Sequence, residues 1–181
     1  MATELNKTTP DAAYIRCKIK RAQCAWADGV VAIGKAEDTA SEAQRVLDEL
    51  YDFDEDGNFI LFKPTLARKV PVRVNEQQTA SYFIGDLSDK PIPEDEKGFA
   101  RTPWDKVTFE KDFFFTELES GDILVMGRCH FYKSDKEGSE PDTTADYTFG
   151  YRKDSMRIFL HHSSRKESKK DCEKYKDSQY I

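Results

Sequence analysis

The chain has 181 residues, which is long enough for one domain with a buried core. Hydrophobic residues make up 38% and aromatic residues 12% of it, which argues against a disordered chain. The formal net charge of -6 disfavours a broad nucleic-acid-binding face, and no apolar run approaches the roughly 20 residues of a membrane span. We therefore expect a folded domain with no nucleic-acid or membrane partner.

Two helices are predicted at the beginning of the chain. Residues 1–9 are polar and are expected to be loose, and Thr9 with Pro10 provides a helix start. From there to about residue 36, apolar residues recur every three or four positions, as in one long amphipathic helix. A second helix is expected to be capped near Thr39 or Ser41, with an inner face formed by Ala43, Val46, Leu47 and Leu50.

The apolar period changes to that of strands after the second helix. Short strands are predicted at residues 59–62 and 70–74, and a short helix at 76–84 carries Ser81 and Tyr82. A loop rich in glycine and proline covers residues 85–103. Four longer strands are then predicted at residues 104–116, 121–133, 143–152 and 155–164.

This order of elements predicts an α+β domain over residues 10–164. Helices that precede a run of hairpin-linked strands indicate an antiparallel sheet, which we expect to curve around the long first helix. Such a curved sheet leaves a pocket at its open end. Residues 165–181 are nearly all charged or polar and are predicted to form a solvated tail or a linker.

A polar cluster ends the last predicted strand, where the sequence reads Leu160-His-His-Ser-Ser164. Buried polar groups need partners, so four in succession after an apolar run indicate either a functional site or a solvated strand end. Successive side chains leave opposite faces of a strand. His161 and Ser163 therefore form one set and His162 and Ser164 the other, and only one set can face a pocket.

Metal binding is only weakly indicated. Residues 52–57 copy the opening of an EF-hand loop, but position twelve is Lys63, where calcium needs a bidentate Glu. The three histidines match a catalytic zinc site in number, but the consecutive His161 and His162 can hardly share one ion. The cysteines lack metal-ligand spacing and are predicted to be free thiols: Cys17, Cys24, Cys129 and Cys172. We predict no cofactor, with manganese or zinc as the minority alternatives.

Six blocks of sequence, in order and at similar spacing, resemble the iota class of carbonic anhydrases of algae, diatoms and bacteria. They span roughly residues 25–164, and the chain is more remotely similar to the association (hub) domain of calcium/calmodulin-dependent protein kinase II and to SnoaL-like proteins. The blocks are Phe62-Lys-Pro-Thr65, Ser81-Tyr-Phe-Ile-Gly85, Glu96-Lys-Gly-Phe-Ala100 with Pro103-Trp104, Met126-Gly127, Tyr147-Thr-Phe-Gly-Tyr151 and Leu160-His-His-Ser-Ser164.

The resemblance implies a cone-shaped α+β barrel, usually a homodimer, that interconverts carbon dioxide and bicarbonate. It implies a polar pocket in which Thr65, Tyr82 and the histidine-serine cluster hold water and bicarbonate. Alignment of the last strand with the hub domain favours His161 and Ser163 as the inward pair. Some members of the family look metal-free and others manganese-dependent, so the resemblance leaves the cofactor open. It also suggests a location in the plastid or the cytoplasm.

We therefore predict a carbonic anhydrase that works without a metal. His161 is assigned as base or proton relay, and Thr65, Tyr82 and Ser163 as the hydroxyls that orient water and bind bicarbonate. A homodimer joined through the sheets is expected, because strands such as residues 112–115 carry more apolar residues than one inner face can use. The alternative is a non-catalytic hub or small-ligand-binding module on the same fold.

Overall fold

The computed structural model describes residues 10–56 and 58–165. The predicted loose N-terminus and nearly all of the predicted tail lie outside these residues. Among the described residues, no helix is long and apolar enough to cross a membrane.

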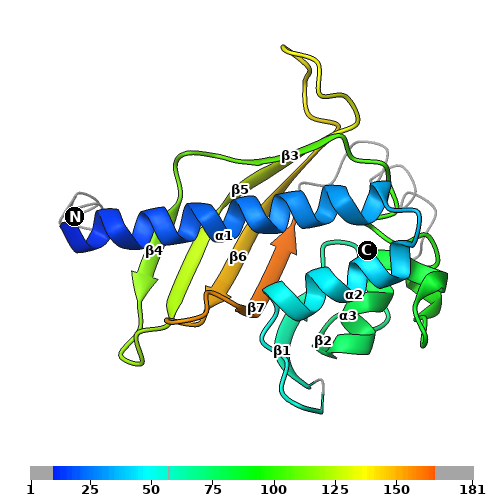
Figure 1. Cartoon of the computed structure of the whole chain (residues 1–181), viewed down its shortest axis with the longest axis horizontal. Coiled ribbons are helices and arrows are strands. Elements are labelled where there is room, and N and C mark those ends of the chain that lie inside the picture. The colour runs from blue at the N-terminus through cyan, green and yellow to red at the C-terminus, as the bar shows by residue number, and fades with distance from the viewer. Residues whose placement is uncertain (1–9, 57, 166–181) are drawn as a thin grey trace, which may run out of the picture.

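Helix α1 (Pro10–Lys35) lies across one face of a curved sheet, as Figure 1 shows. The apolar stripe seen in the sequence is the buried side of this helix, and its most buried members are Ile19, Trp26, Val30 and Ile33. These side chains pack against the aromatic and aliphatic residues of the strands to form the hydrophobic core. The long amphipathic helix predicted from the sequence is confirmed, almost to the residue.

Helices α2 (Thr39–Leu50) and α3 (Glu76–Ile84) lie together beside one end of α1 (Figure 1). Helix α2 begins after Asp38, whose carboxylate accepts a hydrogen bond from the Ser41 backbone N–H. The cap was predicted near Thr39 or Ser41, and it is the preceding residue, Asp38, so that Thr39 and Ser41 lie inside the first turn. Ala43, Val46 and Leu47 are buried on the inner face, as predicted.

The sheet has seven strands, of which the order β2-β1-β7-β6-β5-β3 forms a continuous path and β4 also pairs with β5. Their bounds are β1 (Asn58–Lys63), β2 (Arg73–Asn75), β3 (Lys106–Phe109), β4 (Phe114–Glu117), β5 (Ile123–Tyr132), β6 (Thr143–Tyr151) and β7 (Ile158–Ser164). Within the described chain, β2 and β3 end the path without pairing with each other, so the sheet is curved but open rather than a closed barrel.

One pair of neighbouring strands is parallel, which the antiparallel prediction missed. Strand β1 runs parallel to β7, and Phe62 is the register partner of His161. The other pairs are antiparallel. The parallel pair is possible because β1 and β7 are far apart in the sequence and are not joined by a hairpin.

The strand predicted at 104–116 is divided into β3 and β4, which pair with different parts of β5. Five residue steps separate Phe109 from Phe114, but only three separate their partners Cys129 and Met126, so two residues bulge out of the ladder. The bulge contains Lys111 and Asp112, which interrupt the apolar pattern. It divides the strand without removing either half from the sheet.

The segment after α3 folds back over that helix and forms a wall of the open end of the sheet. It contains the 3-10 turns η1 (Gly85–Leu87) and η2 (Pro93–Asp95). Gly85 and Gly98 both have positive φ, and a Cβ on either would lie less than 3 Å from backbone atoms of the other segment. The contact is held by hydrogen bonds from the backbone N–H of Phe99 and Ala100 to carbonyls of α3.

Candidate active site

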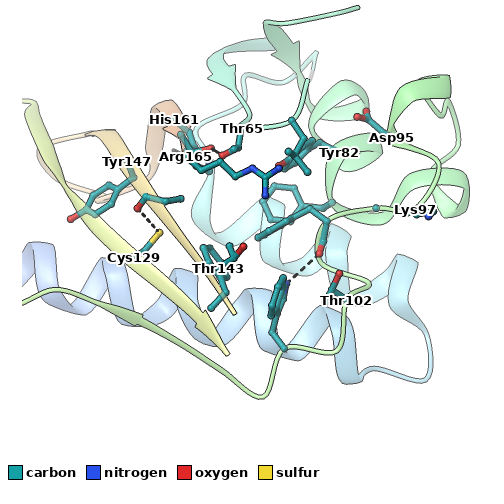
Figure 2. Close-up of a pocket in the computed structure, with 18 of the residues that line it drawn as sticks. Thr65, Tyr82, Asp95, Lys97, Thr102, Cys129, Thr143, Tyr147, His161 and Arg165 are labelled. Carbon is teal, nitrogen blue, oxygen red and sulfur yellow. Dashed lines mark hydrogen bonds between the residues drawn. The ribbon is translucent and has the colours of Figure 1, made fainter. Parts of the chain in front are cut away.

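A cavity of about 500 Å³ opens between the concave face of the sheet, α1 and the segment after α3 (Figure 2). Much of its wall is aromatic, contributed by Trp26, Phe83, Phe99, Trp104, Phe131 and Phe149. All four residues predicted for the site also line it: Thr65, Tyr82, His161 and Ser163. An apolar wall with a few convergent polar groups is typical of a small-molecule site.

Strand β7 turns His161 toward the cavity and His162 away from it. His161 is 4% exposed and lines the cavity together with Ser163, whereas His162 and Ser164 are exposed on the opposite face. The structure therefore places His161 and Ser163 as the inward pair. The alternation of side chains along a strand fixes this division.

The imidazole of His161 is held among aromatic rings. Its ring stacks on Phe62 with a centroid distance of 4.4 Å, and it meets Phe149 edge to face at 4.7 Å. Burial, with a smaller contribution from His162, lowers the pKa of His161 to about 3. His161 is therefore a neutral imidazole near pH 7.

A hydrogen bond also connects His161 to the interior of the protein. Its Nδ1 lies 2.9 Å from the hydroxyl oxygen of Tyr51, which in turn accepts a hydrogen bond of 3.0 Å from the indole N–H of Trp26. Burial raises the pKa of Tyr51, so its phenol keeps its proton. Neither Tyr51 nor Trp26 was among the residues predicted for the site.

Thr65 and Ser163 form a pair of hydroxyls at the cavity. The Thr65 hydroxyl donates to the Ser163 oxygen over 2.8 Å, although the two residues are 98 positions apart. Thr65 follows the end of β1, and Ser163 lies two positions after His161 on the neighbouring β7. Since Thr65 donates to Ser163, the Ser163 hydroxyl keeps its own proton for another acceptor.

Tyr82 is brought to the cavity by α3. It is 8% exposed, and burial together with the nearby charge of Asp95 raises the pKa of its hydroxyl. Asp95 is itself anchored, because it accepts hydrogen bonds from Ser81 and from the fully buried Arg73. Tyr82 is therefore a neutral donor and acceptor at physiological pH.

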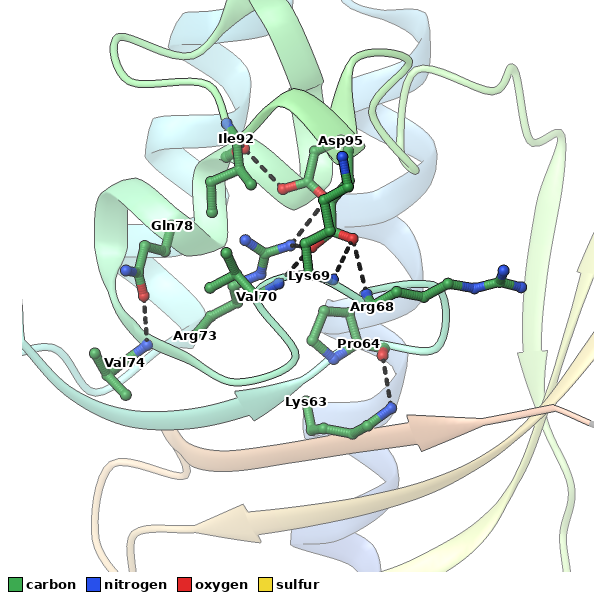
Figure 3. Close-up of polar contacts among 12 residues, drawn as sticks. Lys63, Pro64, Arg68, Lys69, Val70, Arg73, Val74, Gln78, Ile92 and Asp95 are labelled. Atoms are coloured by element: carbon green, nitrogen blue, oxygen red, sulfur yellow. Dashed lines mark hydrogen bonds and ion pairs between the residues drawn. The ribbon is translucent and has the colours of Figure 1, made fainter. Parts of the chain in front are cut away.

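The segment that carries Thr65 is tied down by Glu94 and Arg73 (Figure 3). The Glu94 carboxylate accepts 2.8 Å hydrogen bonds from three successive backbone N–H groups, those of residues 68–70. Burial alone would raise the pKa of Glu94, but these N–H groups hold it below its usual value. Glu94 thus remains ionised and connects one wall of the cavity to another.

Arg165 was missed by the sequence analysis, which placed it in the tail. It lines the cavity, and Figure 2 shows its side chain extending from the end of β7 toward Tyr82. The sequence did contain a signal, because Arg165 continues the alternation of His161 and Ser163 on the inward face. It places a positive charge at a site predicted to hold an anion.

The histidines do not converge on one point. His130 contacts Thr144 and Glu110 through its two ring nitrogens, away from the inward-facing His161. Among residues 10–56 and 58–165, no group of three or more His, Cys, Asp or Glu side chains is arranged to hold a metal ion. The EF-hand-like segment leads into β1 instead of a helix, and its Asp52 pairs with Arg152.

Residues 17–165 match the sequence profile of the metal-independent carbonic anhydrases, and the chain belongs to this family. It catalyses the reversible hydration of carbon dioxide to bicarbonate without a metal. Both the predicted activity and the predicted independence of a metal cofactor are thereby confirmed, and the enzyme is favoured over a non-catalytic module.

The fold is shared with a solved structure described as a calcium/calmodulin-dependent protein kinase II association domain from Xanthomonas campestris. The two superpose with a TM-score of 0.51 at 21% sequence identity, over 87% of this chain and 89% of that one. At this identity the likeness shows the fold alone. No curated protein matches the sequence.

Proposed function

We propose that carbon dioxide is hydrated in the cavity beside the Thr65–Ser163 pair. The observation that carries this proposal is the 2.8 Å hydrogen bond between the two hydroxyls, next to His161 on the inward face of β7. Carbon dioxide has no net dipole and suits the aromatic wall, whereas water and bicarbonate need the polar groups. The cavity offers both surfaces to one reaction.

The hydroxyls move the proton in this proposal. A water oxygen attacks the carbon of carbon dioxide while one water proton passes to a hydroxyl of the Thr65–Ser163 pair. The pair returns a proton to an oxygen of the former carbon dioxide, which gives carbonic acid. Carbonic acid then releases a proton to solvent and becomes bicarbonate, so atoms and charge balance without a strong base. The low pKa of His161 makes it a weak base, which favours the hydroxyls over the predicted role of His161 as proton acceptor.

Two further side chains contribute to binding. The Tyr82 hydroxyl is a neutral hydrogen-bonding group, and the positive charge of Arg165 attracts the bicarbonate anion. Replacing Arg165 should therefore raise the KM for bicarbonate more than the KM for carbon dioxide. Stopped-flow measurement of both directions for Arg165→Gln tests this, and an equal change in the two KM values would contradict it.

The site itself is tested by carbon dioxide hydration assays on variants of its residues. Loss of activity in Thr65→Ala and Ser163→Ala, with full activity in Ser164→Ala on the exposed face, is the expected pattern. Full activity in both inward variants would place the reaction elsewhere.

We also propose that two copies associate through the convex face of the sheet. Phe114 and Met126 are register partners on β4 and β5, and both are about 60% exposed. Leu61 on β1 is exposed to a similar degree. These side chains give the outer face the apolar character of an interface, and the fold neighbour is described as an association domain. Light scattering at micromolar concentration should give the mass of a dimer.

For origin and compartment, we propose an algal protein located in the plastid or the cytoplasm, and the resemblance to the iota class of algae, diatoms and bacteria supports this. A fluorescent fusion of the native protein expressed in an alga would test this.

A further inference from the structure

A buried row of three side chains leads from α1 to the cavity and connects Trp26, Tyr51 and His161. Their exposed fractions are 3%, 0% and 4%. The indole nitrogen of Trp26 lies 3.0 Å from the Tyr51 oxygen, which lies 2.9 Å from Nδ1 of His161. Each atom in this row has a restricted hydrogen-bonding capacity, so the protons can be assigned.

The assignment begins at Trp26, because an indole N–H can only donate. The Tyr51 oxygen therefore accepts from Trp26, and the remaining proton of Tyr51 needs an acceptor. Among the described residues, Nδ1 of His161 is the acceptor that the Tyr51 hydroxyl contacts. The reverse arrangement, in which Nδ1–H donates to Tyr51, would leave the Tyr51 proton buried without a partner.

Nδ1 of His161 is thus the unprotonated nitrogen. A neutral imidazole carries its single proton on the other nitrogen, Nε2. Nε2 has no hydrogen-bond partner among the described residues, and His161 lines the cavity. The Nε2–H group is therefore available to a molecule bound in the cavity.

We propose that Trp26 and Tyr51 are positioning residues that fix His161 as the Nε2–H tautomer and aim it as a hydrogen-bond donor at an oxygen of the substrate. The proposal rests on the proposed function, since it assumes that the reaction takes place in this cavity. His161 then stabilises the oxygen on which negative charge develops during hydration, and it does not take the proton from water.

The packing around His161 supports a fixed donor. Phe62 stacks on the imidazole, with an interplanar angle of 22°, and Trp26 meets it edge to face at 5.6 Å. The ring therefore cannot turn to exchange its two nitrogens without displacing aromatic neighbours. Burial, which lowers the pKa of His161, also opposes the imidazolium that a base would have to form.

The tautomer can be read directly by NMR, independently of activity. In the full chain with ¹⁵N-labelled histidine, two-bond ¹⁵N–¹H correlations distinguish a proton on Nε2 from one on Nδ1. His130→Gln and His162→Gln assign the remaining signal to His161. We expect the Nε2–H pattern from pH 6 to pH 8. An Nδ1–H pattern would overturn the inference while leaving carbonic anhydrase activity in place.

Tyr51→Phe is the decisive variant, and Tyr151→Phe is its matched control. Both tyrosines are 0% exposed, but the Tyr151 hydroxyl has no hydrogen-bond partner within the described residues. Tyr51→Phe should give a mixture of His161 tautomers and lower kcat about tenfold or more, with little change in KM for carbon dioxide. Tyr151→Phe should change neither quantity. A changed tautomer with unchanged kcat in Tyr51→Phe would exclude the donor role.

A second variant covers the case in which Tyr51→Phe does not fold. Trp26→Phe removes the indole N–H but leaves the Tyr51 hydroxyl free to donate to Nδ1. Because the Tyr51 oxygen could then also accept from Nδ1–H, a minor Nδ1–H signal should join the Nε2–H signal, and kcat should fall two- to threefold. A tautomer as uniform as in the wild type would remove Trp26 from the positioning pair. If the wild-type protein showed the Nε2–H tautomer but Thr65→Ala and Ser163→Ala kept full activity, the proposed site would fail and the donor role with it, but not the proton assignment.

Discussion

The two faces of the sheet are made by the same strands but have opposite characters. On the concave face, His161 lies among aromatic rings under α1 and beside the cavity. On the convex face, the next residue, His162, is exposed, and its row across the sheet continues through Thr148 to Met126. A shift of one position therefore separates the cavity proposed for the reaction from the face proposed for association. The following predictions test this division.

The largest effect is expected from the two histidines. His161→Phe keeps an aromatic ring in the buried position but removes the hydrogen-bonding nitrogens, and we expect hydration to fall about a hundredfold. His162→Phe, one position along the strand, should stay within about twofold. Stopped-flow hydration assays on both variants make the comparison. Equal losses would show that the inward orientation of His161 has no special part in the reaction.

The burial of His161 also predicts how the stability of the fold depends on pH. In the unfolded chain a histidine gains a proton below about pH 6.5, but the pKa of folded His161 is about 3. Between these values the unfolded state binds more protons, so His161 destabilises the wild-type fold as the pH falls. From pH 6 to pH 4, wild type should lose about 2.5 kcal/mol relative to His161→Phe. Urea unfolding across this range measures the difference, and parallel curves for the two proteins would refute the prediction.

On the convex face, a charge should weaken association and leave the chemistry unchanged. Met126→Lys places an ammonium at an exposed apolar position that we propose to be buried in the dimer. Burying it should cost at least about 2 kcal/mol, a factor of about thirty in the dissociation constant. Sedimentation at several concentrations measures that constant. An unchanged constant would remove this face from the interface.

The hydroxyls of the cavity should each contribute a smaller effect. Thr65→Ala, Ser163→Ala and Tyr82→Phe should each lower activity about tenfold, which corresponds to about 1.4 kcal/mol per hydrogen bond. Because Thr65 donates to Ser163, the double variant Thr65→Ala with Ser163→Ala should lose less than the product of the single losses. Independent, multiplicative losses would mean that the two hydroxyls do not act as one pair.

Chelation should have no effect. Prolonged dialysis against a chelator is expected to leave the hydration rate within about twofold of its starting value, because the family is metal-independent. Elemental analysis of the dialysed protein is the control. Activity that falls on dialysis and returns with one specific metal would contradict the prediction.

The sequence predicted those parts of the fold that depend on periodicity. The stripe containing Ile19, Trp26 and Ile33 defined α1, and side-chain alternation separated His161 from His162. Periodicity does not reveal which strands become neighbours, so the parallel pairing of β1 with β7 could not be derived. The division of β3 from β4 was hidden for the same reason, since a bulge is defined by the partner strand.

The sequence predicted which residues line the cavity, but it did not predict the low pKa of His161 or the contact of His161 with Tyr51. Thr65, Tyr82, His161 and Ser163 all line the cavity, but the low pKa of His161 comes from rings supplied by distant segments. Tyr51 directly follows α2, and nothing in the sequence indicates its contact with Nδ1 of His161. The local sequence contains no information on burial by residues that are distant along the chain. Without such burial His161 would have a pKa of about 6.5, which suits a base.

The distance along the chain between contacting residues has a consequence for folding. Tyr51 and His161 are 110 positions apart, Thr65 and Ser163 are 98 apart, and β7 must insert between β1 and β6 before either contact forms. Closing such long loops is slow compared with forming local helices and hairpins. Recovery of activity during refolding should therefore follow the last and slowest phase, after helical signal has returned. The arrival of β7 should then complete the sheet and the proposed active site in the same event.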